Sequence, residues 1–262
     1  MTVIKMKKNK KVKYLAAAVT AAVLVIGMSI AYLTESDSLY NLFTVGEAKV
    51  DIDEGEFEQN RAVSPGQSSK KAPKAVNKGS IDEIVFMEVT LPQREISVLD
   101  DITQAPGDEN AAVNPKKMQS LFSTAVDVGK TSDFVTEDGT EYKDFVYNTT
   151  EENGGSWIFL KSEFTAAKAA TATTPAVDAT RKFVFGYSGK LASGEDTSTI
   201  FDSVILKRFM EEDIAGGESV QIDVNAVCIQ ANNLDGHDTS TLDKDSLTDI
   251  YGICKNKGLT TQ

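Results

Sequence analysis

Short segments in which apolar and polar side chains alternate recur along this chain, and they constrain its fold more than any other feature. In residues 219–230 every second side chain from Val220 to Cys228 is apolar, and residues 84–91 repeat the pattern from Val85 onward. Alternation with a period of two is typical of β-strands that bury one face. Because clusters of Gly, Asp, Asn and Ser separate the segments, the pattern predicts many short antiparallel strands.

Shorter segments fit the same interpretation. Pro92 is expected to end the strand at residues 84–91, because proline cannot donate a hydrogen bond to a neighbouring strand. Further strands or extended segments are predicted at residues 42–52, 70–77, 145–148, 157–164, 182–187 and 203–209.

The period of the pattern changes near the C-terminus, at residues 241–254. Leu247, Ile250, Tyr251 and Cys254 recur at the spacing of one helix face, which predicts a short amphipathic helix packed on the strands. Together these patterns predict a mainly β fold, an antiparallel two-sheet sandwich that is jelly-roll-like and carries a short C-terminal helix.

Two stretches without a strand pattern are expected to be insertions, near residues 93–118 and 161–182. The first contains two prolines and scattered acids, and it is predicted to cross the surface with a short helix around residues 114–122. The second includes residues 166–180, which are mainly Ala, Thr and Pro and lack the large apolar groups of a core element.

The N-terminus has the pattern of a secretory signal peptide. Lysines up to Lys13 precede an apolar run from Leu15 to Ile30, and small residues lie one and three positions before a possible cut between Ala31 and Tyr32. We therefore expect residues 1–31 to be a signal peptide and residues 32–262 to form a single secreted domain without a stable membrane anchor. A retained transmembrane helix is the alternative, although the apolar run is slightly short for one.

Charge is distributed unequally between the leader and the rest of the chain. The leader contains six of the 27 basic residues and none of the 39 acidic ones, so residues 32–262 have 21 basic residues and a net charge of −18. A surface this negative repels phosphate groups, and the sequence predicts no nucleic-acid partner.

Catalytic and metal-binding motifs are scarce. Zinc proteases of the common kind need two histidines one helical turn apart, whereas this chain contains only His237, in a loop-rich run. No serine lies in a nucleophile-elbow context, and no phosphate-binding glycine loop or paired-cysteine motif is present. The sequence predicts no catalytic residues, no resident metal and no cofactor.

Acidic clusters leave calcium as a weak alternative. The candidate ligands are Asp235, Asp238, Asp243 and Asp245, with a second group at Asp51, Asp53, Glu54 and Glu56. Neither group fits the twelve-residue calcium loop, so solvated acids or favourable charge at a helix start are the simpler interpretations.

The two cysteines, Cys228 and Cys254, leave two possibilities open. A disulfide between them would close a loop of about 27 residues and contribute on the order of 3 kcal/mol in the chain-entropy model. Two buried thiols, one on a strand and one on a helix, are an equally good prediction.

Several motifs resemble a family of exported Gram-positive proteins that are processed by a SipW-type signal peptidase, the TasA and camelysin-like family. The resemblance is carried by residues 31–37, 41–52, 65–67, 71–73, 77–79, 85–92 and 226–233. It covers the first ninety residues well and the C-terminal part moderately.

This resemblance implies a jelly-roll-like sandwich located at the cell surface or in the extracellular matrix of a Gram-positive bacterium. For TasA-like relatives it also implies fibres in which the freed N-terminal segment adds a strand to the next subunit. We therefore expect a non-enzymatic surface or biofilm-matrix protein, with a SipW-type signal peptidase and other copies of itself as partners. The alternatives are a camelysin-like secreted metallo-endopeptidase and a surface adhesion module that binds its ligand through residues 93–117.

Overall fold

The computed structural model describes residues 46–56, 62–99, 115–132, 135–137, 140–170, 177–210, 213–214, 220–232, 234, 239 and 241–256. All of them belong to one unit, Gly46–Gln262. The leader, the Ala31–Tyr32 cleavage site and His237 lie outside these residues. Within them the chain is mainly β, with antiparallel sheets and one short C-terminal helix, so the predicted fold class is confirmed.

The larger layer is built around the long strand β4. Its strand order is β12-β4-β10-β9, with β5 pairing with one end of β4. All the pairings are antiparallel. The strands are β12 (Asp223–Gln230), β4 (Glu83–Ile96), β10 (Ala179–Tyr187), β9 (Trp157–Thr165) and β5 (Lys117–Ser120).

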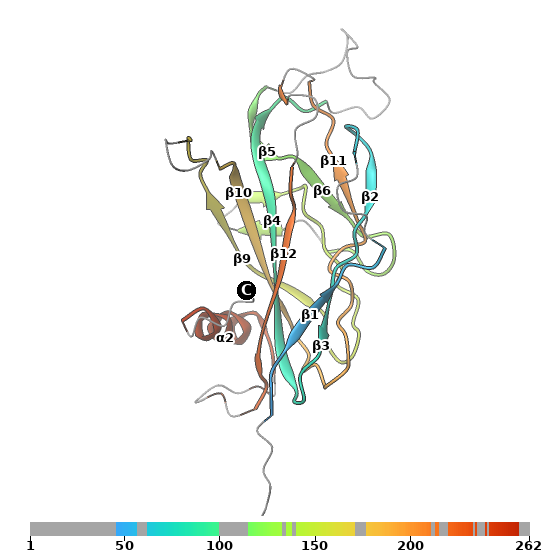
Figure 1. The fold of residues 1–262 in the computed structure, drawn as a ribbon, viewed down its shortest axis with the longest axis vertical. Helices are drawn as coiled ribbons and strands as arrows, with labels where there is room; N and C mark the ends of the chain where they lie inside the picture. The colour runs from blue at the N-terminus through green and yellow to red at the C-terminus, as the bar shows by residue number, and fades with distance from the viewer. Residues whose placement is uncertain are drawn as a thin grey trace, which may run out of the picture. The chain divides into compact units, whose positions relative to one another are not determined.

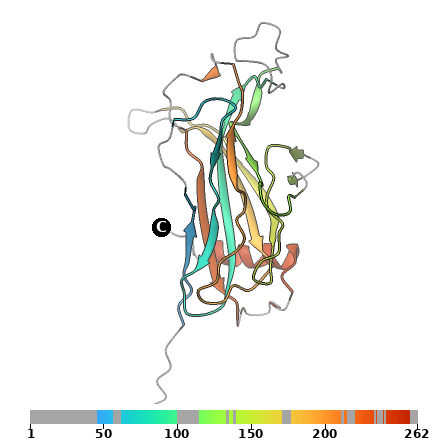
Figure 2. The same cartoon turned by 90° about the vertical axis from the view of Figure 1, so that its right-hand side faces the viewer.

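The second layer consists of shorter strands that face the larger sheet (Figures 1 and 2). One set has the order β2-β11-β6, and a second set pairs β1 with β3. Residues 194–200 connect the two sets, because Thr197 N donates to Ala75 O at 2.9 Å and residues 203–206 continue as β11. The bounds are β1 (Val50–Asp53), β2 (Ser68–Lys70), β3 (Lys74–Asn77), β6 (Phe122–Ala125) and β11 (Ser203–Leu206). A separate hairpin joins β7 (Val135–Glu137) and β8 (Thr140–Tyr142).

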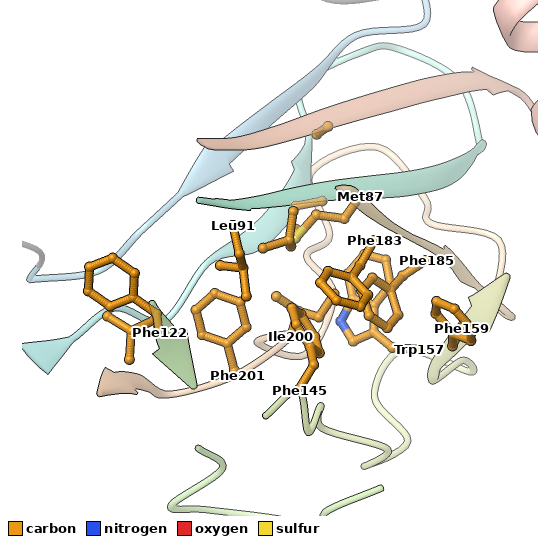
Figure 3. Packing of buried hydrophobic residues seen from close by; sticks show 14 of the residues in the cluster. Met87, Leu91, Phe122, Phe145, Trp157, Phe159, Phe183, Phe185, Ile200 and Phe201 are labelled. Carbon is orange, nitrogen blue, oxygen red and sulfur yellow. The ribbon is translucent and has the colours of Figure 1, made fainter. Parts of the chain in front are cut away.

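Alternation along the strands builds the main core between the two layers. The side chains of β4 at Val85, Met87, Val89 and Leu91 are fully buried on the inner face. Figure 3 shows the aromatic part of this core, in which the ring centroid of Phe145 lies 4.5 Å from that of Phe183. This packing supports the sandwich that the alternation predicts.

The helix α2 (Lys244–Asn256) covers the outer face of the larger sheet. Its predicted apolar residues are all buried, and they form a second cluster with Ile84 and Phe86 of β4 and Val184 of β10. The helix and its buried face are therefore confirmed at Leu247, Ile250, Tyr251 and Cys254.

The expected end of a strand at Pro92 is wrong, because β4 continues to Ile96. Along one edge of β4, β12 pairs as far as Thr90 and β5 pairs from Gln93 onward. Pro92 lies between these two partners, where no N–H donor is required, and its carbonyl accepts a hydrogen bond from Leu121 N at 3.1 Å.

Other local expectations also differ from the structure. The helix expected at residues 114–122 is wrong, because residues 117–120 and 122–125 form β5 and β6. The strand predicted at residues 145–148 is wrong, because among the described residues this segment makes only an isolated bridge, between Asn148 and Thr131. The ring of Phe145 is nevertheless buried in the main core. A buried side chain in a loop therefore gave this segment the sequence pattern of a strand. Around the second insertion, β9 extends to Thr165 and β10 begins at Ala179, so the crossing is shorter than residues 161–182.

Candidate functional site

The first strand, β1, lies at an edge of the second layer. It pairs antiparallel with β3, from Val50 opposite Asn77 to Asp53 opposite Lys74. Among the described strands, β3 is its only ladder partner. We refer to β3 together with Ser80, Glu83 and Cys228 as the β1 dock, because these groups contact β1 or the residues that lead into it.

The strand β1 closes one side of the sandwich. It packs against β12, the edge strand of the larger sheet, without forming a ladder with it (Figure 1). The backbone of Val50 lies against the Cys228 thiol on β12. Removing β1 would therefore uncover both the edge of β3 and the inner face of β12.

Few side chains hold β1 in this position. Val50 is buried and Ile52 is half-buried against the main core, whereas Asp51 and Asp53 are exposed. Full burial of an aliphatic side chain contributes about 1.5–3 kcal/mol. One buried and one half-buried side chain therefore hold β1 far less firmly than the many buried side chains of β4 hold that strand. This is the balance expected of an edge strand that can exchange partners.

A tight turn fixes the chain just before β1. Ser80 N donates to Glu47 O at 2.9 Å, Ser80 Oγ accepts from Glu47 N at 3.0 Å, and Lys78 N donates to Lys49 O at 2.7 Å. Gly79 allows this approach, since a Cβ atom there would lie 2.9 Å from Lys49 N and even closer to Glu47 O.

Glu83 lies under the start of β1 and is fully buried. Its Oε1 accepts a hydrogen bond from Lys49 N at 2.5 Å, whereas Oε2 has no hydrogen-bond partner. Burial raises the pKa of this carboxyl, and burial also raises the pKa of the neighbouring Cys228 thiol to about 12. Cys228 is therefore a neutral thiol at physiological pH and a poor nucleophile.

Ion pairs lie at the other end of β1. Lys74 of β3 pairs with Asp196 at 2.5 Å and approaches Asp53 of β1 at 3.8 Å. The hydrogen bond to Asp196 raises the pKa of Lys74. Lys71 is buried and pairs with Glu54, just beyond β1. The acids at Asp53 and Glu54, which were weak calcium candidates, thus have lysine partners.

The remaining calcium candidates are only partly described. Asp243 caps helix α2, where its Oδ1 accepts hydrogen bonds from Ser246 N at 2.9 Å and from Ser246 Oγ at 2.7 Å. These bonds lower the pKa of Asp243. Asp245 is exposed in the first helical turn, and Asp235 and Asp238 lie outside the described residues. Across the described ranges, no group of three His, Cys, Asp or Glu side chains is placed to hold a metal ion.

The two cysteines lie on opposite faces of the larger sheet and are not joined by a disulfide. Cys228 pairs in register with Val85 and packs against the main core, whereas Cys254 is buried in the cluster under α2. The sheet thus separates two side chains whose Cβ atoms would have to lie about 3.5–4.5 Å apart for a disulfide.

A second polar cluster, on the outer face of the larger sheet, was not found by sequence analysis. Glu88 is buried there, accepts a hydrogen bond from Tyr251 Oη and pairs with Lys255 at 2.5 Å. Lys182 and Lys161 pair with Glu163 at 2.8 and 2.7 Å and lower its pKa to about 2. Every member has a partner, so the cluster attaches helix α2 to the sheet.

Within the part of the chain that is described, no helix is both long and apolar enough to cross a membrane.

No protein-family model matches the chain, and the searches of curated proteins and of solved structures also returned no match.

Proposed function

We propose that this protein is a non-enzymatic, exported protein of the cell surface or biofilm matrix, whose copies assemble when the N-terminal strand of one subunit docks on the next. The observation that carries the proposal is β1 itself. Among the described strands, this four-residue strand pairs only with β3, and it closes the sandwich with two apolar side chains. An extended segment that leaves its own dock can add to the same dock on another copy.

Sequence features support export. Residues 32–49 separate the lysine-led apolar leader from β1, so cleavage after Ala31 would leave an N-terminal arm of 18 residues ahead of that strand. The family resemblance, to TasA and camelysin-like proteins processed by a SipW-type peptidase, rests on the same region. We assign this protein the same location, outside a Gram-positive cell.

A covalent lock on β1 tests the assembly. Asp51 lies directly opposite Val76 in the β1–β3 register, and side chains at such positions lie close enough for a disulfide after small adjustments. The double variant Asp51→Cys/Val76→Cys therefore holds β1 on its own subunit under oxidising conditions. Light scattering and electron microscopy of protein purified from the medium then measure assembly.

We expect the unsubstituted protein and the reduced double variant to assemble, and the oxidised double variant to remain monomeric. The single variants Asp51→Cys and Val76→Cys are the matched controls and should assemble in both conditions. Normal assembly of the oxidised double variant would contradict strand addition by β1. Monomers at every concentration of the unsubstituted protein would contradict assembly altogether.

A further inference from the structure

A buried carboxyl lies where β1 meets its dock, and one of its oxygens is unsatisfied. Glu83 has no exposed surface, and its Oε2 has no hydrogen-bond partner. Its Oε1 receives the backbone N–H of Lys49, the residue before β1, at 2.5 Å. A buried polar atom without a partner is uncommon in folded proteins and requires a physical explanation.

The groups around Glu83 are almost all neutral. From β12 the Cys228 thiol faces it, and from the β1 side it meets backbone at Lys49. From the turn before β4 it is approached by Gly79, and the Glu83 backbone bonds to Leu191. Asn77 of β3 directs its amide to the carbonyls of Ile81 and Leu191.

No cation offsets the buried charge within the described residues. None of the ion pairs found there includes Glu83, and the Lys49 and Lys78 residues at the turn are exposed. Burial raises the pKa of Cys228 to about 12, and the charge of Cys254 on α2 also raises it. Cys228 is therefore a neutral thiol across the physiological pH range. An ionised Glu83 would therefore be buried with only the Lys49 N–H and the Cys228 thiol as hydrogen-bond donors and no counter-ion among the described residues, which is unfavourable.

We propose that Glu83 makes the docking of β1 dependent on protonation, so that the strand is held most firmly when this carboxyl carries a proton. The inference rests on the strand exchange proposed above and names its regulator. When β1 leaves the dock, Glu83 loses its cover and reaches water, where the ionised form is stable.

The direction of the effect follows from linkage. Burial raises the pKa of Glu83 in the docked form, and in the undocked form we expect the ordinary glutamate pKa of 4.5. Between these two values the docked form binds more protons, so docking weakens as pH rises through this window and is constant below it. One proton changes the docking equilibrium by at most about tenfold per pH unit.

Hydrogen exchange in β1 measures this equilibrium on the full chain. The amides of residues 50–53 are followed from pH 4 to pH 8 in the unsubstituted protein and in Glu83→Gln, at concentrations where both are monomeric. Dividing the two rates at each pH removes the intrinsic pH dependence of exchange chemistry. We expect the ratio of unsubstituted to Glu83→Gln rates to rise several-fold above pH 4.5.

Glu88→Gln is the matched control, since Glu88 is a buried carboxyl of the same strand that faces α2 instead of β1. In Glu88→Gln, the hydrogen-exchange rates of the β1 amides should depend on pH in the same way as in the unsubstituted protein. A ratio for Glu83→Gln that does not change with pH, or that falls as pH rises, would overturn the inference.

A carboxyl carbon titration of Glu83 by NMR in the unsubstituted protein covers the case in which Glu83→Gln does not fold. A midpoint above 4.5 supports the inference, and a midpoint at or below 4.5 overturns it. Both measurements use monomers, so their failure is distinguishable from a failure of fibre assembly.

Discussion

Gly79 brings the turn before β4 against the residues that lead into β1. A side chain at this position would collide with the backbone of Glu47 and Lys49 and with the Glu83 carboxyl. The same turn carries the hydrogen bonds between Ser80 and Glu47. The placement of β1 therefore depends on the absence of one Cβ atom.

We expect Gly79→Ala to lower the free energy of unfolding by about 1–3 kcal/mol, the usual result of forcing an extra methyl group into a packed site. Urea denaturation measures the change. Gly252→Ala in α2 is the control, because a Cβ atom there has nothing within 4 Å and alanine favours a helix over glycine. Equal stability of Gly79→Ala and the unsubstituted protein would show that the turn is free to move.

The ion pairs of Glu163 in the polar cluster on the outer face of the larger sheet can be tested by changing pH. Lys161 and Lys182 lower its pKa to about 2 from 4.5, so its stabilising contribution is present above pH 4.5 and lost as pH falls towards 2. Because the ion pair with Lys182 is partly exposed, Glu163→Gln should lower the free energy of unfolding by less than about 1 kcal/mol at pH 7. Urea denaturation at pH 7 and at pH 2 should show this cost disappearing at the lower pH, and a larger cost at pH 2 would contradict the assignment.

At the scale of elements, the strands with strict alternation and the helix were predictable from sequence. The helix spacing of Leu247, Ile250 and Tyr251 and the alternation around Val85 each encode one buried face. The strand end predicted at Pro92 is wrong for a tertiary reason. A proline fits within β4 at this position because it lies in the gap between the partner strands β12 and β5, and local sequence does not reveal that gap. Phe145 was misread because a buried ring in a loop resembles a strand in sequence.

The attachment of α2 to the sheet yields its own prediction. Leu247 is fully buried under the helix, so Leu247→Ala should lower the free energy of unfolding by about 2–5 kcal/mol. Thr248→Ala, one residue along on the exposed face, should change it by less than about 0.5 kcal/mol. Similar losses for both variants, in urea denaturation, would contradict packing of α2 on the sheet.

The β1 dock was only partly predictable. The alternation of Val50 and Ile52 in residues 42–52 predicted a strand with one buried face, and the structure has β1 at residues 50–53. Glu83 has the same parity as Val85 and Met87, so its position on the inner face of β4 follows from the alternation. Its contact with Lys49 and Cys228 joins segments far apart in sequence, and no local pattern contains that information.

For the whole molecule, export predicts a defined N-terminus. Cleavage between Ala31 and Tyr32 would release a protein that begins at Tyr32 and has a net charge of −18. Intact mass and N-terminal sequencing of protein from the medium check this expectation. Protein that retains Met1 and stays inside the cell would contradict export.

Strand addition requires that β1 of one copy occupies the dock of another. Its most direct test mixes two single variants, Asp51→Cys and Val76→Cys, whose positions are opposite each other in the β1–β3 register. Oxidation followed by non-reducing electrophoresis and mass spectrometry then detects a disulfide between residues 51 and 76 of different chains. The control mixture pairs Asp51→Cys with Val128→Cys, an exposed position that is not part of the β1 dock. We expect heterodimers joined through residues 51 and 76 and few in the control, whereas equal yields in both mixtures, or none in either, would contradict strand addition by β1.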